Sequence, residues 1–274
     1  MLRTQWAMVT VTGLPGIAAV IALIFTFITL HQSQAALNIT EQGQITDRYN
    51  AAVTNLGSAT IDIRLGGIYA LQRIMTDSPR DQPAIISILS AFIRVHDPIP
   101  AYEANTIPMD PPPPLKPDIA AALHVLASRT AAHDGGNVID LSNTYLAGTD
   151  LANADLRGAN LASADLRSAN LSNAYLAGTD LASADLRSAN LASANLASAD
   201  LRSANLAVTD LAGAELSGAD LVETDLSATD LAGSDISVQQ VTKARPNEAT
   251  TLPDQEAADP RVRKRIAEVA RNET

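Results

Sequence analysis

The sequence predicts an α+β chain in which an apolar helix and a small helical module precede a solenoid built from five-residue units. Three observations carry this prediction. No Asp, Glu, Lys or Arg occurs between Arg3 and Glu41, and apolar residues then recur at helical spacing over much of residues 38–131. From Leu141 to Ile236 every fifth residue is apolar, and all of these except the last are Leu. Aromatic residues are 3% of the chain and apolar residues 46%, so the core must consist mainly of Ala, Leu, Ile and Val.

The N-terminal stretch predicts a transmembrane helix over residues 7–30. Leu14–Leu30 is almost unbroken apolar sequence, and residues 7–30 carry no charge over a length where about 20 residues suffice to cross a bilayer. This predicts a single-pass anchor in the cell membrane. Two alternatives are a cleavable signal ending at Ser33-Gln34-Ala35 and a buried helix of a soluble protein. Arg3 precedes the span and no Lys or Arg follows it until Arg48, which favours a cytoplasmic N-terminus. A single arginine does not decide on which side of the membrane the rest of the chain lies.

A helical module is expected over residues 38–97. Gly57 should end its first helix, Ile61, Leu65, Ile68 and Met75 mark a second, and residues 83–95 form an apolar third. The Pro-rich residues 98–117 predict an extended linker. Residues 118–131 predict a short helix placed to cover the N-terminal end of the solenoid.

Catalytic and metal sites are not expected in this chain. Cysteine is absent, which excludes disulfides and thiolate chemistry. His96, His124 and His133 lack metal-ligand spacing, and no nucleophile–base motif accompanies them. His96 is interpreted as a cation at a helix C-terminus. We therefore expect no enzyme activity, no catalytic residue, no metal and no cofactor.

The five-residue spacing excludes a regular helix and a straight strand. On a helix, residues five apart are rotated by more than a third of a turn beyond one full turn, so they form no stripe. On a straight strand, an odd spacing would alternate the leucines between two faces. The leucines stay on one side only if the chain turns a corner in every unit, which predicts a polygonal solenoid whose turns stack on one another.

The repeated motif resembles the pentapeptide-repeat family, whose pattern A(D/N)Lxx appears as Ala154-Asp155-Leu156 and Ala189-Asn190-Leu191. The resemblance implies a right-handed quadrilateral β-helix with four units per turn, hence about five turns over residues 137–240. EQGQITDRY and DIRLGGIYALQRI also resemble a helical segment before such repeats in bacterial membrane-anchored relatives. The expected inward core is Leu141, Leu146, Leu151, Leu156, Leu161, Leu166, Leu171, Leu176, Leu181, Leu186, Leu191, Leu196, Leu201, Leu206, Leu211, Leu216, Leu221, Leu226, Leu231 and Ile236.

The C-terminal tail, residues 241–274, predicts a short basic amphipathic helix that caps the other end of the solenoid. Asp259 is placed as N-cap and Pro260 as the first helical residue, with Val262, Ile266 and Val269 on one face. The basic run Arg261–Arg265 offers an alternative role against anionic lipid or nucleic acid.

Charge is concentrated on the repeat. Residues 137–236 carry 4 basic and 14 acidic side chains, a net charge of −10 out of −11 for the chain, which argues against nucleic-acid binding there. Arg167 and Arg187 are expected to stack with Asp165 and Asp185 as a mixed-charge ladder. No Lys or Arg lies between Arg202 and Lys243. The candidate partner surface is therefore Asp210, Glu215, Asp220, Glu223, Asp225, Asp230 and Asp235.

These features predict a non-enzymatic, membrane-anchored scaffold that presents an acidic surface to a protein partner whose identity is open. A homodimer is also compatible with the pattern. The alternative follows from a resemblance to the quinolone-resistance members of the same family, whose acidic rods occupy a type II topoisomerase in place of DNA.

Overall fold

The computed structural model describes residues 2–99 and 112–272, and it describes side-chain environments outside residues 2–21 and 35–39. The chain divides into two compact units, residues 1–51 and 52–274. The described residues of the first unit all belong to helix α1 (Leu2–Leu56). The sequence predicted two separate helices here, whereas the structure has one continuous helix that ends where Gly57 was expected to end it.

The membrane span expected over residues 7–30 is not found. Among the described residues, no helical stretch combines the length and the hydropathy that a bilayer crossing requires. Residues 7–21 lie outside the residues whose side chains are described. Most of the expected linker, residues 98–117, likewise lies outside the described residues.

A helical module opens the second unit. It consists of α2 (Ile61–Asp77), a 3-10 turn at Pro79–Asp81, α3 (Gln82–His96) and α4 (Pro117–Ala127), which pack against one another. Close approach in this module depends on Gly67, because a Cβ atom there would lie 2.8 Å from the carbonyl oxygen of Ala52. Arg64 and the buried Asp118 form an ion pair at 2.6 Å that ties α2 to the start of α4.

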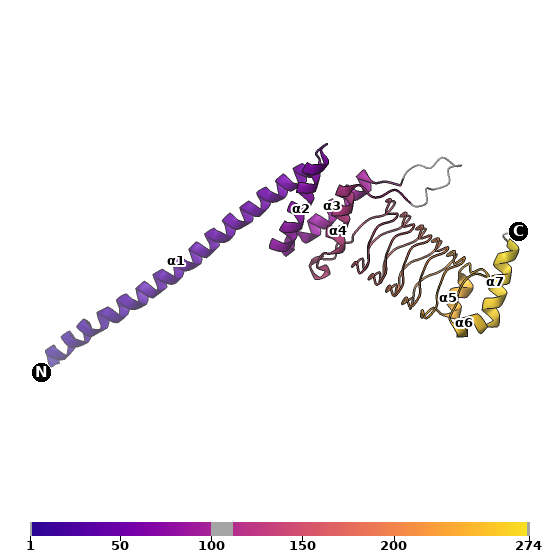
Figure 1. Ribbon diagram of the computed structural model, residues 1–274. Helices are drawn as coiled ribbons and strands as arrows, with labels where there is room; N and C mark the ends of the chain where they lie inside the picture. The colour runs from indigo at the N-terminus through magenta and orange to yellow at the C-terminus, as the bar shows by residue number, and fades with distance from the viewer. Residues whose placement is uncertain (1, 100–111, 273–274) are drawn as a thin grey trace. The chain divides into compact units, whose positions relative to one another are not determined.

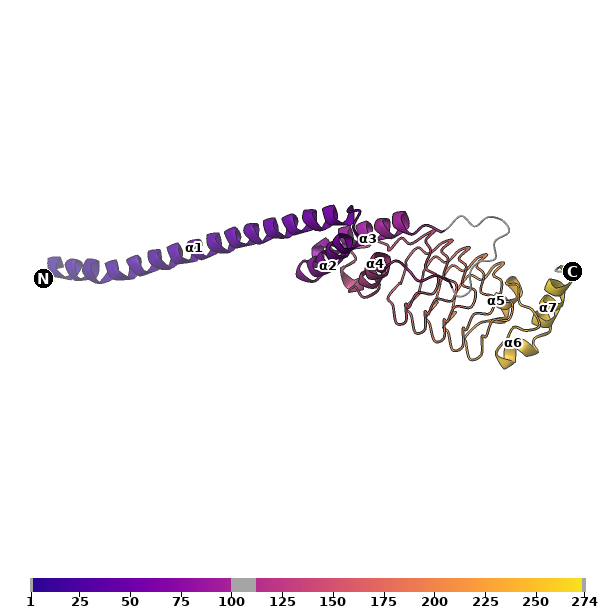
Figure 2. The same cartoon turned by 45° about the horizontal axis from the view of Figure 1, so that its top comes forward.

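Residues 139–236 form a four-sided solenoid whose turns stack side by side (Figures 1 and 2). Isolated parallel bridges join residues 20 positions apart, so each turn contains four five-residue units. The residue before each central Leu or Ile therefore belongs to one of four columns, which define faces A to D. Face A begins at Asp140, face B at Tyr145, face C at Asp150 and face D at Asp155, and each continues in steps of 20.

The described residues of the solenoid form single bridges and no longer strands, so the expected β-helix is not confirmed as a sheet structure. The reason lies in the corner of each unit. Every residue two places after a central Leu, from Asn143 to Gly233, has φ between 55° and 72°. A residue in this left-handed region ends an extended segment. From Leu146 to Leu231, the N–H three places after each central Leu donates to the carbonyl of that Leu, which closes a β-turn with the positive φ of a type II turn.

The core of the solenoid is a stack of leucines. All the central residues from Leu141 to Ile236 are buried, and none is more than 3% exposed. The residue two places before each of them, usually Ala or Thr, is buried as well. The buried Thr hydroxyls donate to carbonyls of central leucines, as Thr209 does to Leu186 at 2.7 Å, so these polar groups are satisfied inside an apolar stack.

Other segments contact both ends of the solenoid. At the first turn, the N–H of Asp155 donates to the carbonyl of Ala127 at the end of α4. At the last turn, α5 (Val238–Lys243) lies on the stack, and the Gln240 amide donates to the carbonyls of Leu216 and Ala219 at 2.7 and 3.0 Å. Helix α5 was not expected from the sequence.

Helices α6 (Asp254–Ala258) and α7 (Pro260–Asn272) follow. Helix α7 begins at Pro260, and Asp259 accepts the N–H of Arg261 at 2.8 Å. Val262 and Val269 are buried, and α7 packs against α5. The tail helix therefore starts at the expected residue and buries two of the expected apolar positions.

Candidate functional site

The acid or amide before each leucine completes the hydrogen bonding of the backbone. In the unit centred on Leu186, four N–H groups bond to backbone carbonyls, three of them in neighbouring turns and one, that of Ala184, in the preceding unit of the same turn. The fifth N–H, that of Arg187, donates to Oδ1 of Asp185 at 3.3 Å. The Asp side chain thus supplies the one acceptor that the backbone lacks, in the manner of an Asx turn.

This contact recurs along the whole solenoid. All but one of the units with Asp or Asn before the central residue make it, at 2.9 to 3.3 Å. Asp235 is the exception, because its Oδ1 accepts the N–H of Leu216 instead. One carboxylate oxygen of most acids is therefore committed to the fold.

The seven acids of the candidate partner surface do not share a face. The bridges place Asp220 on face A, Asp225 on face B, Asp210 and Asp230 on face C, and Glu215 and Asp235 on face D, with Glu223 at a corner. Two of them lie near bases that are distant in sequence: Asp220 is 3.8 Å from Arg202, and Glu223 is 3.8 Å from Arg265 of α7. The structure brings the pairs on faces C and D together and separates the others.

Face B carries the mixed-charge ladder. Arg167 pairs with Asp165 at 2.7 Å and approaches Asp185 of the next turn at 3.7 Å, and Arg187 pairs with Asp185 at 2.5 Å. Asp165 is 4% exposed and Arg167 9% exposed. These two acids are neutralised within the fold, which leaves Asp225 as the acid of face B that makes no ion pair among the described residues.

Similar pairs neutralise acids on faces A and D. The side chain of Arg157 donates to Asp155, and this hydrogen bond lowers the pKa of the carboxyl against the opposing effect of burial. Arg202 lowers the pKa of Asp200 in the same way. Both carboxylates stay charged and paired at neutral pH.

Three units have a residue that cannot form the Asx contact, namely Tyr145, Tyr175 and Glu215. The N–H groups two residues after them, on Ala147, Ala177 and Ser217, have no acceptor in the described part of the chain.

Tyr145 has an evident structural role. It is 6% exposed, and its hydroxyl donates to the carbonyl of Pro113, which ties the end of the linker to face B.

Tyr175 and Glu215 have no comparable role, and both lie on face D. Tyr175 is 53% exposed, and its hydroxyl has no hydrogen-bond partner among the described residues. Two turns away, the exposed carboxylate of Glu215 accepts a bond from the Asn195 amide at 2.5 Å. The corner residues that follow them, Gly178 and Gly218, have no side chain. We call Tyr175, Asn195 and Glu215 the face D patch.

The histidines do not form a site within the described residues. No group of three His, Cys, Asp or Glu residues is placed to hold a metal ion there. His96 ends α3, and its Nδ1 lies 2.9 Å from the carbonyl oxygen of Phe92. His96 therefore lies at the C-terminus of a helix, where the sequence places it.

Comparison with known proteins identifies the repeat. The family model for pentapeptide repeats matches residues 139–173, 169–207 and 209–237, in 8 copies. A pentapeptide repeat protein from Nostoc Pcc 7120 is 31% identical over 42% of this chain and 74% of its own, with a TM-score of 0.21. The chain belongs to the pentapeptide-repeat family.

Two further solved structures are similar to this pentapeptide-repeat protein. One is a pentapeptide repeat protein from the Arabidopsis thaliana thylakoid lumen, with 27% identity over 44% of this chain and 86% of its own, at a TM-score of 0.28. The other is QnrB1, a plasmid-mediated fluoroquinolone resistance protein, with 18% identity over 47% and 70%, at a TM-score of 0.23. No curated protein matches the chain significantly.

Sequence reasoning found the repeat of this pentapeptide-repeat protein but missed the face D patch. A signal was present, because Tyr175 and Glu215 interrupt the pattern of Asp and Asn and lie two turns of four units apart in the same column. Counting acids drew attention to the stretch after Leu206. The residues that depart from the pattern are more informative than those that repeat it.

Proposed function

We propose that this pentapeptide-repeat protein is a non-enzymatic scaffold that binds a protein partner through the face D patch. The observation that carries the proposal is the replacement of the structural Asp or Asn by Tyr175 and Glu215 on one face. Each replacement leaves a backbone N–H without its acceptor, which costs about 1–3 kcal/mol where the group is buried and less where water reaches it. Residues that give up a stabilising contact and make no other structural contact in its place are candidates for function.

The family supports the general role, because pentapeptide-repeat proteins are generally protein-interaction scaffolds. The patch supports a specific partner chemistry. An exposed Tyr ring offers a rigid apolar surface, and tyrosine is enriched among residues that dominate interface energies. Glu215 adds negative charge two turns away on the same face. The matching partner surface is a protein segment with an arginine or lysine next to an apolar side chain.

The remaining acids support an accessory role. Asp210 and Asp230 on face C and Asp235 on face D are exposed, and none makes an ion pair among the described residues. Together with Glu215 they make the C-terminal half of two neighbouring faces negative. Such a surface speeds the encounter with a basic partner more than it adds to final affinity.

The alternative of a DNA mimic that acts on a type II topoisomerase receives less support. Most acids of faces A and B are paired with arginines, and only Asp180 and Asp225 of these two columns make no ion pair among the described residues. A supercoiling assay with the full chain tests this alternative. Inhibition or protection of the type II topoisomerase at micromolar concentrations of the protein would support it.

Attachment to a membrane through residues 7–30 stays part of the proposal as a prediction from sequence. Fractionation of cells that express the full chain, with a carbonate wash, tests it. An integral anchor keeps the protein in the washed membrane pellet, whereas release into the wash contradicts the anchor and leaves the face D proposal intact.

Quantitative co-purification tests the scaffold role. A tagged full-length Tyr175→Asn/Glu215→Asn variant restores the Asx residues, so we expect it to fold and to lose the partner that the unsubstituted protein retains. Ser183→Asn/Ser203→Asn places two substitutions at exposed left-handed corners of face A and serves as the matched control. Equal amounts of the same co-purifying proteins with both variants would refute the face D patch.

A further inference from the structure

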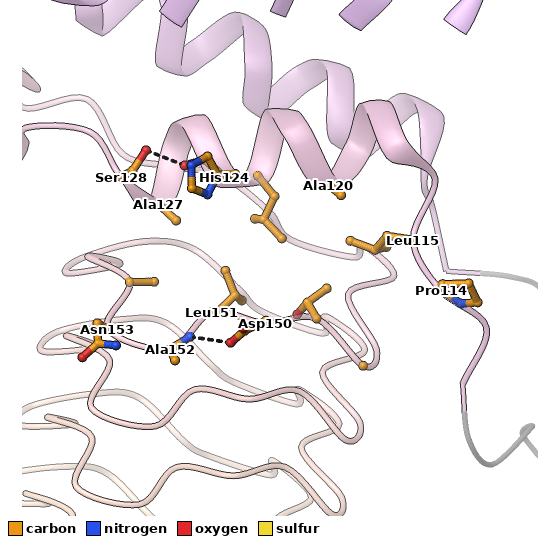
Figure 3. Close-up of a pocket in the computed structure, with 14 residues that line it drawn as sticks. Pro114, Leu115, Ala120, His124, Ala127, Ser128, Asp150, Leu151, Ala152 and Asn153 are labelled. Carbon is orange, nitrogen blue, oxygen red and sulfur yellow. Dashed lines mark hydrogen bonds between the residues drawn. The ribbon is translucent and has the colours of Figure 1, made fainter. Parts of the chain in front are cut away.

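A cavity lies between α4 and the first turn of the solenoid (Figure 3). Its volume is about 450 Å³, which is within the range of ligand-binding pockets in proteins. Leu123 of α4 and Leu151 and Ala154 of the first turn are buried residues of its lining, and Leu115, Ala120 and His124 lie at more exposed positions. The cavity is therefore an apolar hollow with an open rim.

The chain itself shows how the edge of the first turn accepts an extended segment. On face B, residues 97–99 run antiparallel to residues 143–145. The N–H of Tyr145 donates to the carbonyl of Asp97 at 3.0 Å, and the N–H of Ile99 donates to the carbonyl of Asn143 at 3.4 Å. A piece of chain outside the repeat thus adds as a strand to the open edge.

Five residues later, on face C, the corresponding edge has no such cover. The N–H of Asp150 and the carbonyls of Asp150 and Ala152 have no hydrogen-bond partner among the described residues. One turn further, the three equivalent groups of Asn170 and Ser172 are all bonded, at 2.7 to 3.0 Å. Asp150 and Ala152 line the cavity, so this open edge borders the apolar hollow.

We propose that the cavity binds an extended peptide segment of a partner protein, which adds as a strand along residues 150–152. The peptide backbone pairs with the open groups of Asp150 and Ala152, and one apolar side chain enters the hollow above Leu123 and Leu151. Strand addition of this kind obtains affinity from backbone hydrogen bonds and specificity from side-chain pockets. The site lies apart from the face D patch and does not depend on it.

Amide exchange measured by NMR on the full chain tests the proposal directly. The probe is a blocked six-residue peptide of alternating threonine and leucine. We expect it to slow exchange of the Asp150 N–H, while the same peptide with N-methylated leucines, which lacks half of the donors, protects it far less. Equal protection by both peptides, or by neither, would overturn strand addition. A slow Asp150 amide without any peptide would show that another segment or copy already covers the edge, which also overturns the proposal.

A cavity-filling variant provides a second, independent test of the proposal. Ala120 of α4 is exposed and lines the cavity, so Ala120→Phe should place a ring in the hollow without disturbing the core. We expect peptide affinity to fall by about tenfold or more, equivalent to about 1.4 kcal/mol. Ala267→Phe, at an exposed position of α7, is the matched control and should leave affinity unchanged. The same affinity in both variants would contradict binding in the cavity.

Discussion

Oδ1 of Asn190 accepts a hydrogen bond from the backbone N–H of Ala192 at 3.0 Å, a contact that recurs in unit after unit of the solenoid. A unit in the middle of the stack, such as that of Leu191, has five N–H groups, and the backbone of the stacked turns supplies acceptors for four of them. The side chain before the leucine supplies the fifth. This explains why Asp and Asn are interchangeable in the repeat: the contact needs a short side chain with an oxygen, and the negative charge is incidental to it.

Loss and gain of this contact should shift stability in opposite directions. We expect Asn190→Ala to lower the free energy of unfolding by about 1 kcal/mol, because the N–H of Ala192 loses its acceptor. Tyr175→Asn should raise it by up to about 1 kcal/mol, because the N–H of Ala177 gains one. Chemical denaturation of the full chain measures both. A Tyr175→Asn variant that is less stable than the unsubstituted protein would show that the Tyr ring stabilises the fold.

Inward and outward positions of one unit should respond differently to the same substitution. Leu186 is fully buried, so Leu186→Asp places a carboxylate in the leucine stack and should cost more than about 3 kcal/mol. Ser188 is exposed at a left-handed corner that Asp tolerates, so Ser188→Asp should change stability little. Thermal denaturation followed by circular dichroism compares the two, and equal losses would refute the inward and outward assignment.

The corner at Val208 is a site of backbone strain. Val208 has φ of 62°, a left-handed conformation that is unfavourable for a β-branched residue, and it is 62% exposed. We expect Val208→Asn to stabilise the protein by about 1 kcal/mol. Val222, which is not among the residues with positive φ, is the control, and Val222→Asn should give no gain. A stabilisation of the same size in both variants would attribute the effect to side-chain polarity rather than strain.

The start of α7 should be sensitive to acid. Hydrogen bonds from the side chain and then the backbone N–H of Arg261 lower the pKa of Asp259 from 3.8 to about 2. Because the folded-state pKa is below the unfolded value, the contact stabilises α7 above about pH 4 and is lost as the pH falls toward 2. Carboxyl NMR titration should place the Asp259 midpoint near 2 and move it upward in Arg261→Gln. Arg263→Gln is the control and should leave the midpoint unchanged.

The five-residue spacing was enough to predict the cornered solenoid, because no regular helix or strand keeps residues five apart on one side. The same reasoning placed all the leucines, and it located the end of α1 at Gly57 and the start of α7 at Pro260. Helix α5 was not predicted, because its six residues are too short for an apolar period and its capping box was not recognised.

The candidate site was harder to predict, because faces are set by three-dimensional stacking. A run of acids in sequence rotates through four faces, so the seven predicted acids are consecutive along the chain but separated in space. Arg265 of α7 reaches Glu223 from a distant part of the sequence, and no local pattern indicates that pair. The cavity is equally non-local, since it combines α4 with residues 148–154.

The central claim, that face D binds the partner, is tested most directly by one crosslink per face. The chain has no cysteine, and Ser183, Ser188, Ser193 and Ser198 are exposed left-handed corners on faces A, B, C and D in that order. Each is changed to Cys in turn, labelled with a short photo-crosslinker and exposed to cell extract under illumination. The account predicts a discrete protein adduct from Ser198→Cys that Tyr175→Asn abolishes, and little or none from Ser188→Cys on face B. Adducts of equal yield from all four positions, or a strong adduct from face B alone, would contradict it.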